Sequence, residues 1–160
     1  MSAPAAGRRV LVGVGNRDRG DDGAGPAVCD AAGALGATGQ GVEIWEVHAD
    51  PSTLAIRWGP EDTVVVVDAV ITGAATGTLH DLDPDHLVPQ HLGTLSTHGI
   101  GVDEAIRLST VLGTRPKRLH VVGIEAGHLD HGAPLSPAVR SVITEVATRA
   151  LDALASPGRG

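Results

Sequence analysis

The sequence predicts an α/β fold, a three-layer αβα sandwich with a mostly parallel central sheet, on two observations. Short runs rich in Val and Ile alternate with amphipathic stretches along the chain, as in strand–helix–strand units. The length of 160 residues fits one domain, and no internal repeat or linker divides it. We therefore expect a single domain over residues 1–160, with its core at about 9–155.

Five segments have the composition of strands. The strongest is Thr63–Ala69 (TVVVVDA), because four consecutive valines suit a central strand that is covered on both faces. Shorter apolar or alternating runs predict the other strands, with the last of them expected at an edge of the sheet: Arg9–Val14, Val42–Val47, Arg118–Ile124 and Gly77–Leu82.

Four helices are predicted between and after these strands. Pro26 suits the first position of a helix that continues through Ala27–Leu35, and Ser52 is expected to cap a short helix that ends at Trp58. Apolar spacing predicts a helix at Val102–Leu112, after an expected loop at Asp81–Gln90. Ser136 and Pro137 mark the start of a last helix, whose apolar stripe runs from residue 139 to 154.

The composition excludes several classes of protein. With two Trp, no Phe and no Tyr, the core must consist of Val, Leu, Ile and Ala, and nucleic-acid modules that stack bases on aromatic rings are excluded. The net charge of −7 disfavours binding to nucleic acid or to anionic membranes. A single cysteine, with no signal peptide or apolar stretch of membrane-spanning length, indicates a cytoplasmic protein. We also expect a monomer.

The segment Gly13–Gly25, which includes the end of the first strand and the loop Asn16–Gly25, contains the most informative residues. It does not fit a dinucleotide-binding fingerprint, because Asp18 stands where that motif needs Gly or Ala and further carboxylates would repel a pyrophosphate. Two readings stay open for the adjacent acids Asp21 and Asp22. One is a solvated turn in which either acid caps the next helix; the other is a site for a cation.

Two further residues are expected near the same edge of the sheet. Asp68 closes the valine run, so it is either a carboxylate of a structural network or a ligand or general acid/base. His98 precedes the helix at Val102–Leu112; a lone histidine is commonly structural, but this one is in the best setting of the eight. Asp22, Asp68 and His98 together form a ligand set that suits a borderline divalent ion with open coordination positions.

Other catalytic signatures are missing from the sequence. It has no HExxH zinc-protease motif, no GxSxG nucleophile elbow and no Asp-Thr/Ser-Gly motif of pepsin-like proteases. Cys29 falls inside the first predicted helix and has no Cys-x-x-Cys partner, which argues against thiol chemistry.

The loop motif, Gly15-Asn16 followed by Gly20-Asp21-Asp22-Gly23-Ala24-Gly25-Pro26, closely resembles the signature of the nickel–iron hydrogenase maturation endopeptidases. The strand-ending Val67-Asp68-Ala69, the pair Thr97-His98 and the later segments at 122–125 and 135–139 follow the order of that family. The resemblance covers roughly residues 9–155 and implies the αβα fold predicted above.

The resemblance implies an endopeptidase that recognises nickel in the precursor of a hydrogenase large subunit and removes its C-terminal extension. Carried over, the metal-sensing and catalytic residues are Asp22, Asp68 and His98. Nickel is then an element of the substrate rather than a resident cofactor, and no nucleotide is implied. Hydrolysis would use metal-activated water or a carboxylate base, as in an aspartic-type endopeptidase. Two other functions stay open: a non-enzymatic nickel- or precursor-binding chaperone, and a small nucleotide-binding domain.

One segment departs from the family pattern. Many members have an Asp-Gly-Gly type of turn after the second strand, whereas this chain reads Glu46-Val47-His48-Ala49-Asp50-Pro51. Glu46 is the candidate replacement for the family's Asp, and the outer rim of the substrate cleft is expected to differ.

Overall fold

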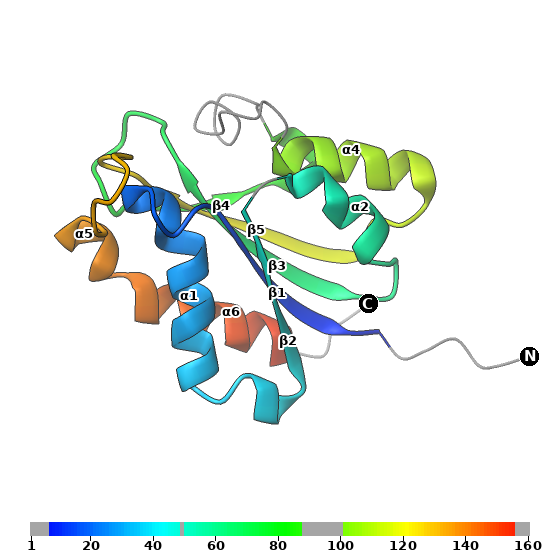
Figure 1. Ribbon diagram of the computed structural model, residues 1–160. Helices are drawn as coiled ribbons and strands as arrows, with labels where there is room; N and C mark the ends of the chain where they lie inside the picture. Colours follow the sequence, from blue (N-terminus) through cyan, green and yellow to red (C-terminus); the bar gives the residue numbers. More distant parts are fainter. Residues whose placement is uncertain (1–6, 49, 88–100, 156–160) are drawn as a thin grey trace, which may run out of the picture.

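The central sheet has five strands, as Figure 1 shows for the computed structural model, which describes residues 7–48, 50–87 and 101–155. The order across the sheet is β2-β1-β3-β5-β4, and every neighbouring pair is parallel except β4 and β5. The strands are β1 (Arg9–Val14), β2 (Val42–Val47), β3 (Thr63–Val70), β4 (Leu79–Leu82) and β5 (Arg118–Glu125). The predicted fold class and the edge position of β4 are confirmed.

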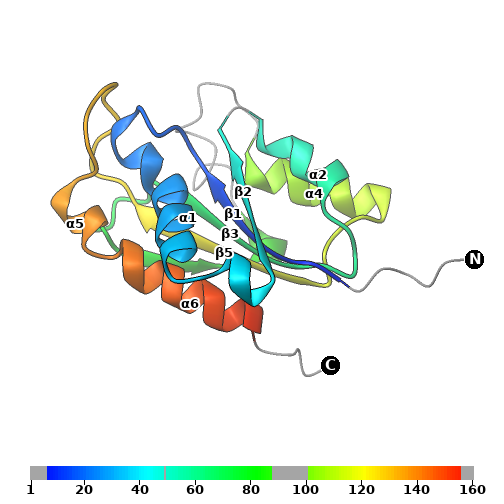
Figure 2. The same cartoon turned by 60° about the horizontal axis from the view of Figure 1, so that its bottom comes forward.

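Helices cover both faces of this sheet, so the molecule has three layers (Figures 1 and 2). α1 (Ala24–Ala34) and α6 (Ile143–Ala155) pack on one face, and α2 (Leu54–Arg57) and α4 (Val102–Leu112) on the other. The short α5 (Pro137–Arg140) precedes α6, and 3-10 turns occur at η1 (Gly20–Gly23), η2 (Thr38–Gln40), η3 (Pro51–Thr53) and η4 (Pro84–His86). None of the helices in the described ranges is long and apolar enough to span a bilayer.

The valine run of β3 divides the core between the two faces. Val65 and Val67 point to the α1/α6 face, and Val64 and Val66 to the α2/α4 face, because successive side chains of a strand alternate. The core is aliphatic as predicted, with one addition: both tryptophans, Trp45 and Trp58, are buried on the α2/α4 face.

The structure corrects one predicted helix start and two predicted capping bonds, whereas the helix start at Ser136 and Pro137 is confirmed. α1 begins at Ala24, so Pro26 lies inside its first turn rather than at its first position. Asp50, not Ser52, is the capping residue of the next segment: its carboxylate accepts a hydrogen bond from the Ser52 amide at 3.0 Å. Ser136 stands at the start of α5 with Pro137 after it, but its hydroxyl makes no capping bond.

The last predicted helix is two helices. α5 ends at Arg140 and α6 begins at Ile143, with a turn between them. The apolar stripe continues through the break, since Val139, Ile143, Val146 and Leu154 all join the same core cluster. The spacing of apolar residues shows which side chains are buried, and these side chains stay buried on both sides of the turn. The spacing therefore does not show where one helix ends and the next begins.

Candidate functional site

Asp68 lies at the carboxyl edge of the parallel sheet, where ligand sites of open α/β folds are found. It is on β3 opposite Gly123 of β5, and the strand continues one residue further than predicted, to Val70. Only 5% of its surface is exposed, and one carboxylate oxygen accepts a hydrogen bond from the Ala69 amide at 2.8 Å. Burial, and then the negative charge of Asp22, raise the pKa of Asp68 well above its ordinary value.

Asp22 is the second member of this pair. It belongs to η1, which directly follows the β1 loop, and its carboxylate accepts a hydrogen bond from the Asn16 amide at 3.0 Å. Burial raises the pKa of Asp22, and the Asn16 bond and the charge of Arg19 offset this only in part. The structure therefore brings Asp22 and Asp68 close enough to repel each other, as a cation-binding pair of carboxylates would.

The glycines of the motif allow the chain to fold this tightly. Gly15 has φ +139°, and a Cβ atom there would lie 1.9 Å from the Asp22 carbonyl oxygen. A Cβ on Gly25 would lie within 2.5–2.7 Å of backbone atoms of Val14 and 2.7 Å from the Val67 carbonyl oxygen. The start of α1 can therefore press against β1 and β3 only where the side chain is a hydrogen atom.

Asp21, next to Asp22, has a different role from either one the sequence suggested. It is fully buried, and it does not cap a helix. Its carboxylate accepts hydrogen bonds from the amides of Gly127 (2.7 Å), His128 (3.2 Å) and Ser136 (2.7 Å), and from the Ser136 hydroxyl (2.5 Å). Burial alone would raise its pKa, but these bonds outweigh that effect and the pKa of Asp21 is lowered.

Asp21 thus ties the loop between β5 and α5 to the motif loop. The bonds span 106 to 115 residues of sequence. No local pattern around Ser136 indicated this pairing, because the sequence there reads equally well as a helix cap.

Glu46, the first residue of the departing segment, lies in β2 and is bound to the motif loop through a network of charges. Arg17 forms ion pairs with Glu46 and with Asp30, the latter at 2.7 Å. The side chains of Arg17, Asp30 and Glu46 are 46%, 63% and 38% exposed, so these pairs contribute little to stability by themselves. Glu46 therefore lies at the rim of the motif loop as a partner of Arg17.

A buried carboxylate that the sequence did not single out as a site residue lies at the end of β5. Glu125 is 1% exposed and accepts hydrogen bonds from the Thr72 amide (2.8 Å) and hydroxyl (2.6 Å), and it pairs with Nε2 of His80 at 3.0 Å. Burial raises its pKa, the donors outweigh burial, and the pKa of Glu125 is lowered. The bonds from Thr72 to Glu125 hold the loop that follows Asp68 and β3.

His98, the third predicted ligand, lies outside the described residues. Within the part of the chain that is described, no three His, Cys, Asp or Glu side chains are arranged to hold a metal ion. Cys29 is buried in α1 as predicted, and burial, together with the nearby charge of Glu46, raises the pKa of its thiol to about 12, which leaves it unreactive.

Comparison with known proteins places this arrangement in a family. The hydrogenase maturation protease family (HycI) matches residues 50–153, a range that includes Asp68 and His98. The hydrogenase expression/formation protein HupD of Thiocapsa roseopersicina is 31% identical over 152 residues, which are 93% of this chain and 68% of HupD.

Solved structures agree in fold. An endopeptidase from Escherichia coli superposes with a TM-score of 0.76 at 25% identity, covering 92% of this chain and 91% of that one. The [NiFe] hydrogenase maturation protease HybD from Thermococcus kodakarensis superposes with a TM-score of 0.65 at 26% identity, covering 91% and 97%. The chain belongs to the hydrogenase maturation protease family, and it is a peptidase.

Proposed function

We propose that this peptidase removes the C-terminal extension from the precursor of a nickel–iron hydrogenase large subunit, and that it acts only once the precursor carries nickel. The observation that supports this most is the Asp22–Asp68 pair. Two carboxylates with raised pKa values lie at the carboxyl edge of the sheet, and the charge of Asp22 is one cause of the raised pKa of Asp68. A cation that approaches the pair offsets the cost of burying two negative charges and the repulsion between them. The pair therefore favours a substrate that presents a divalent ion.

Asp22, Asp68 and His98 are the proposed recognition residues, with nickel as part of the substrate. A carboxylate of raised pKa also accepts a proton from water near neutral pH, so Asp68 is the proposed general base and Asp22 the second candidate. Water activated by the substrate's own nickel is the competing route to the same hydrolysis. We place the reaction in the cytoplasm, with the enzyme acting as a monomer and without a nucleotide.

The test is cleavage of the precursor of the same cell, loaded with nickel, followed by mass spectrometry of the intact protein. Wild-type enzyme should remove one C-terminal peptide from the nickel-loaded precursor and leave the metal-free precursor intact. If no C-terminal peptide is lost from any nickel-loaded precursor of that cell, the proposed function is wrong. Binding without cleavage would indicate a chaperone instead.

Matched variants assign the residues. Asp22→Asn, Asp68→Asn and His98→Ala should each lower the cleavage rate by at least about 100-fold, the effect expected for a group in the reacting site. Asp18→Asn is the control, because Asp18 is an exposed carboxylate in the same loop. If Asp18→Asn lowers the rate as much as Asp68→Asn does, the loop's charge, and not the pair, governs cleavage.

A further inference from the structure

β2 is an edge strand of the sheet, and its outer side carries unpaired backbone groups. The Gly15 amide donates to the Val47 carbonyl at 2.9 Å, so Val47 directs its peptide groups toward β1. Residues of a strand alternate in this direction, which leaves Val42, Ile44 and Glu46 with outward-directed N–H and C=O groups. The Val42 amide confirms the alternation, because it donates outward to the Ala37 carbonyl at 3.0 Å.

Ile44 and Glu46 have no such partner. Their backbone N–H and C=O groups form no hydrogen bond with any of the described residues outside the sheet. A hollow of about 460 Å³ lies along this strand, lined by Thr38, Gly41 and β2 from Val42 to Trp45. Unpaired backbone groups beside an open hollow are the features that accept an added strand from a peptide.

The carboxyl end of this edge adjoins the candidate site. The carbonyl of Val47, the last residue of β2, accepts a hydrogen bond from the Gly15 amide. The amide of Asn16, which follows Gly15, donates to the Asp22 carboxylate. A strand added outside β2 has β2 and β1 between it and β3, so a chain that leaves the carboxyl end of this edge crosses the ends of these two strands to reach the Asp22–Asp68 pair. Six residues of β2 offer about 20 Å of edge at about 3.3 Å per residue.

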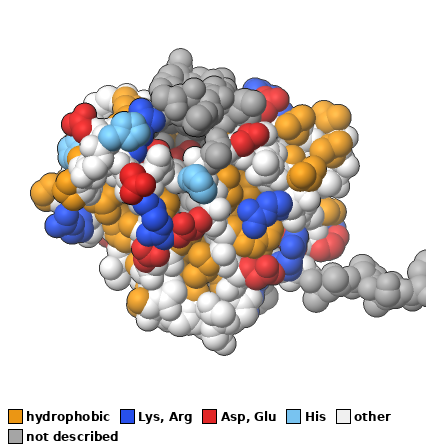
Figure 3. All heavy atoms as spheres, viewed as in Figure 1, with side chains coloured by type: hydrophobic (Ala, Val, Ile, Leu, Met, Phe, Trp, Pro, Cys, Tyr) orange, Lys and Arg blue, Asp and Glu red, His pale blue; other side chains and the backbone are white. Residues whose placement is uncertain are grey.

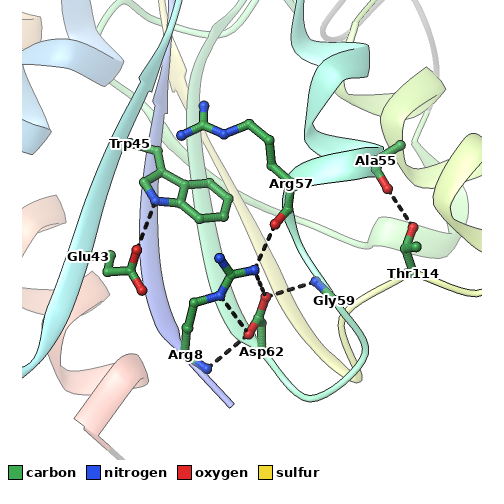
Figure 4. A network of polar contacts seen from close by, with 8 residues as sticks. All are labelled: Arg8, Glu43, Trp45, Ala55, Arg57, Gly59, Asp62 and Thr114. Carbon is green, nitrogen blue, oxygen red and sulfur yellow. Dashed lines mark hydrogen bonds and ion pairs between the residues drawn. The ribbon is translucent and has the colours of Figure 1, made fainter. Parts of the chain in front are cut away.

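One cation beside this edge has no acidic partner among the described residues. The Arg57 guanidinium lies 4.3 Å from the centre of the Trp45 ring, and Figure 4 shows it extended across the indole. Arg8, on the same ring at 5.1 Å, is instead bound to Asp62 at 2.8 Å. The nearby Glu43 carboxylate lies 3.4 Å from the Trp45 indole nitrogen. Of these two arginines, Arg57 is therefore the one that can form an ion pair with a carboxylate from another chain.

We propose that the outer edge of β2 binds the C-terminal extension of the hydrogenase precursor as an added strand; this rests on the proposed function. Ile44 and Glu46 each exchange an N–H and a C=O bond with the extension. Every second side chain of the added strand points to the face of Trp45 and Arg57. There Arg57 pairs with a carboxylate of the extension, either an acidic side chain or the chain terminus. Glu46, already paired with Arg17, does not repel this carboxylate as a free acid would.

The decisive variant is Ile44→Pro. Proline removes the outward N–H of residue 44 and places its ring in the path of an added strand, while the bonds between β1 and β2, made by the odd-numbered residues, remain. We expect the KM for nickel-loaded precursor to rise about tenfold with kcat little changed. Ile44→Val is the matched control, because it keeps the N–H and nearly the same side chain, and its KM should stay within about twofold.

Two further measurements keep the inference testable if Ile44→Pro does not fold. Hydrogen exchange of the wild-type protein, with a synthetic peptide of the extension, should slow at the Ile44 and Glu46 amides by about tenfold and not at exposed amides of α6. Arg57→Gln should raise KM about two- to fivefold and Arg57→Lys less, as for a partly exposed ion pair. Arg140→Gln, a change of an exposed arginine on α5, should have no effect.

The outcomes separate this inference from the function on which it rests. Unprotected Ile44 and Glu46 amides, or an unchanged KM for a folded Ile44→Pro, overturn the β2 assignment even while the wild type cleaves its precursor. Failure of the wild type to cleave nickel-loaded precursor overturns the proposed function. Slowed exchange at the two amides then still identifies the edge as a peptide-binding surface.

Discussion

Asp21 and Asp22 are adjacent carboxylates that should respond in opposite ways to the same substitution. Asp21→Asn preserves the shape of a fully buried side chain, but its amide group can accept hydrogen bonds through one oxygen only. In the most favourable orientation the Ser136 amide loses its acceptor, and the bonds from Gly127, His128 and the Ser136 hydroxyl lose their charge. Asp22→Asn instead removes a charge that the fold disfavours.

The magnitudes follow from these contacts. An unsatisfied buried donor costs about 1–3 kcal/mol, and losing the charge from three bonds adds about 1 kcal/mol each, so Asp21→Asn should lower the free energy of unfolding by about 4–6 kcal/mol. In a protein of this size that corresponds to a fall in Tm of about 10–20 °C. Asp22→Asn should leave stability unchanged or raise it by up to about 1 kcal/mol.

Urea and thermal unfolding at pH 7 measure both variants, and pH provides an internal check. Because the pKa of Asp21 is lower in the folded than in the unfolded state, its stabilisation is present above about pH 4 and is lost as pH falls through the folded pKa. The difference between wild type and Asp21→Asn should therefore shrink in acid. An Asp21→Asn variant within 1 kcal/mol of wild type at pH 7, or less affected than Asp22→Asn, would refute this reasoning.

Three other substitutions test the same structure. Asp68→Asn should abolish cleavage yet raise Tm at pH 7; since the folded pKa of Asp68 is raised, the gain should vanish below about pH 4, where the unfolded carboxyl is also protonated. Gly25→Ala should prevent folding or cost more than about 4 kcal/mol by circular dichroism melting, because its Cβ would meet only backbone atoms, of Val14 and Val67. Asp62→Asn should lower Tm through the weakened Arg8 pair, and an unchanged Tm in 0.1 M salt would contradict the contribution of that pair.

The strands and the site loop could be predicted from the sequence with small errors. β1, β2 and α4 have the predicted bounds, since burial on one or both faces leaves a periodic apolar pattern within a few residues. The glycines and acids of the motif loop identified the family and the edge of the sheet. The predicted capping bonds of Ser136 and Ser52 were wrong, because a serine hydroxyl that suits a cap also suits other partners, and both hydroxyls donate to a carboxylate instead.

The roles of individual acids could not be predicted. Asp21 and Asp22 are neighbours with the same side chain, yet one binds a loop more than 100 residues away and the charge of the other raises the pKa of Asp68. Likewise, nothing near Glu125 indicated that it would pair with His80 on the neighbouring strand β4. Such partners depend on which elements the fold brings together.

The sequence by itself therefore determined the αβα architecture, the edge of the sheet that carries the site, and the family. Local periodicity and the steric demand for glycine are properties of short segments, and these survive in a single sequence. The tertiary structure alone decided which carboxylate is structural, which pair has raised pKa values, and that the Ile44 and Glu46 backbone groups remain open. These properties arise from burial and from contacts between distant segments, and they exist only once the chain has folded.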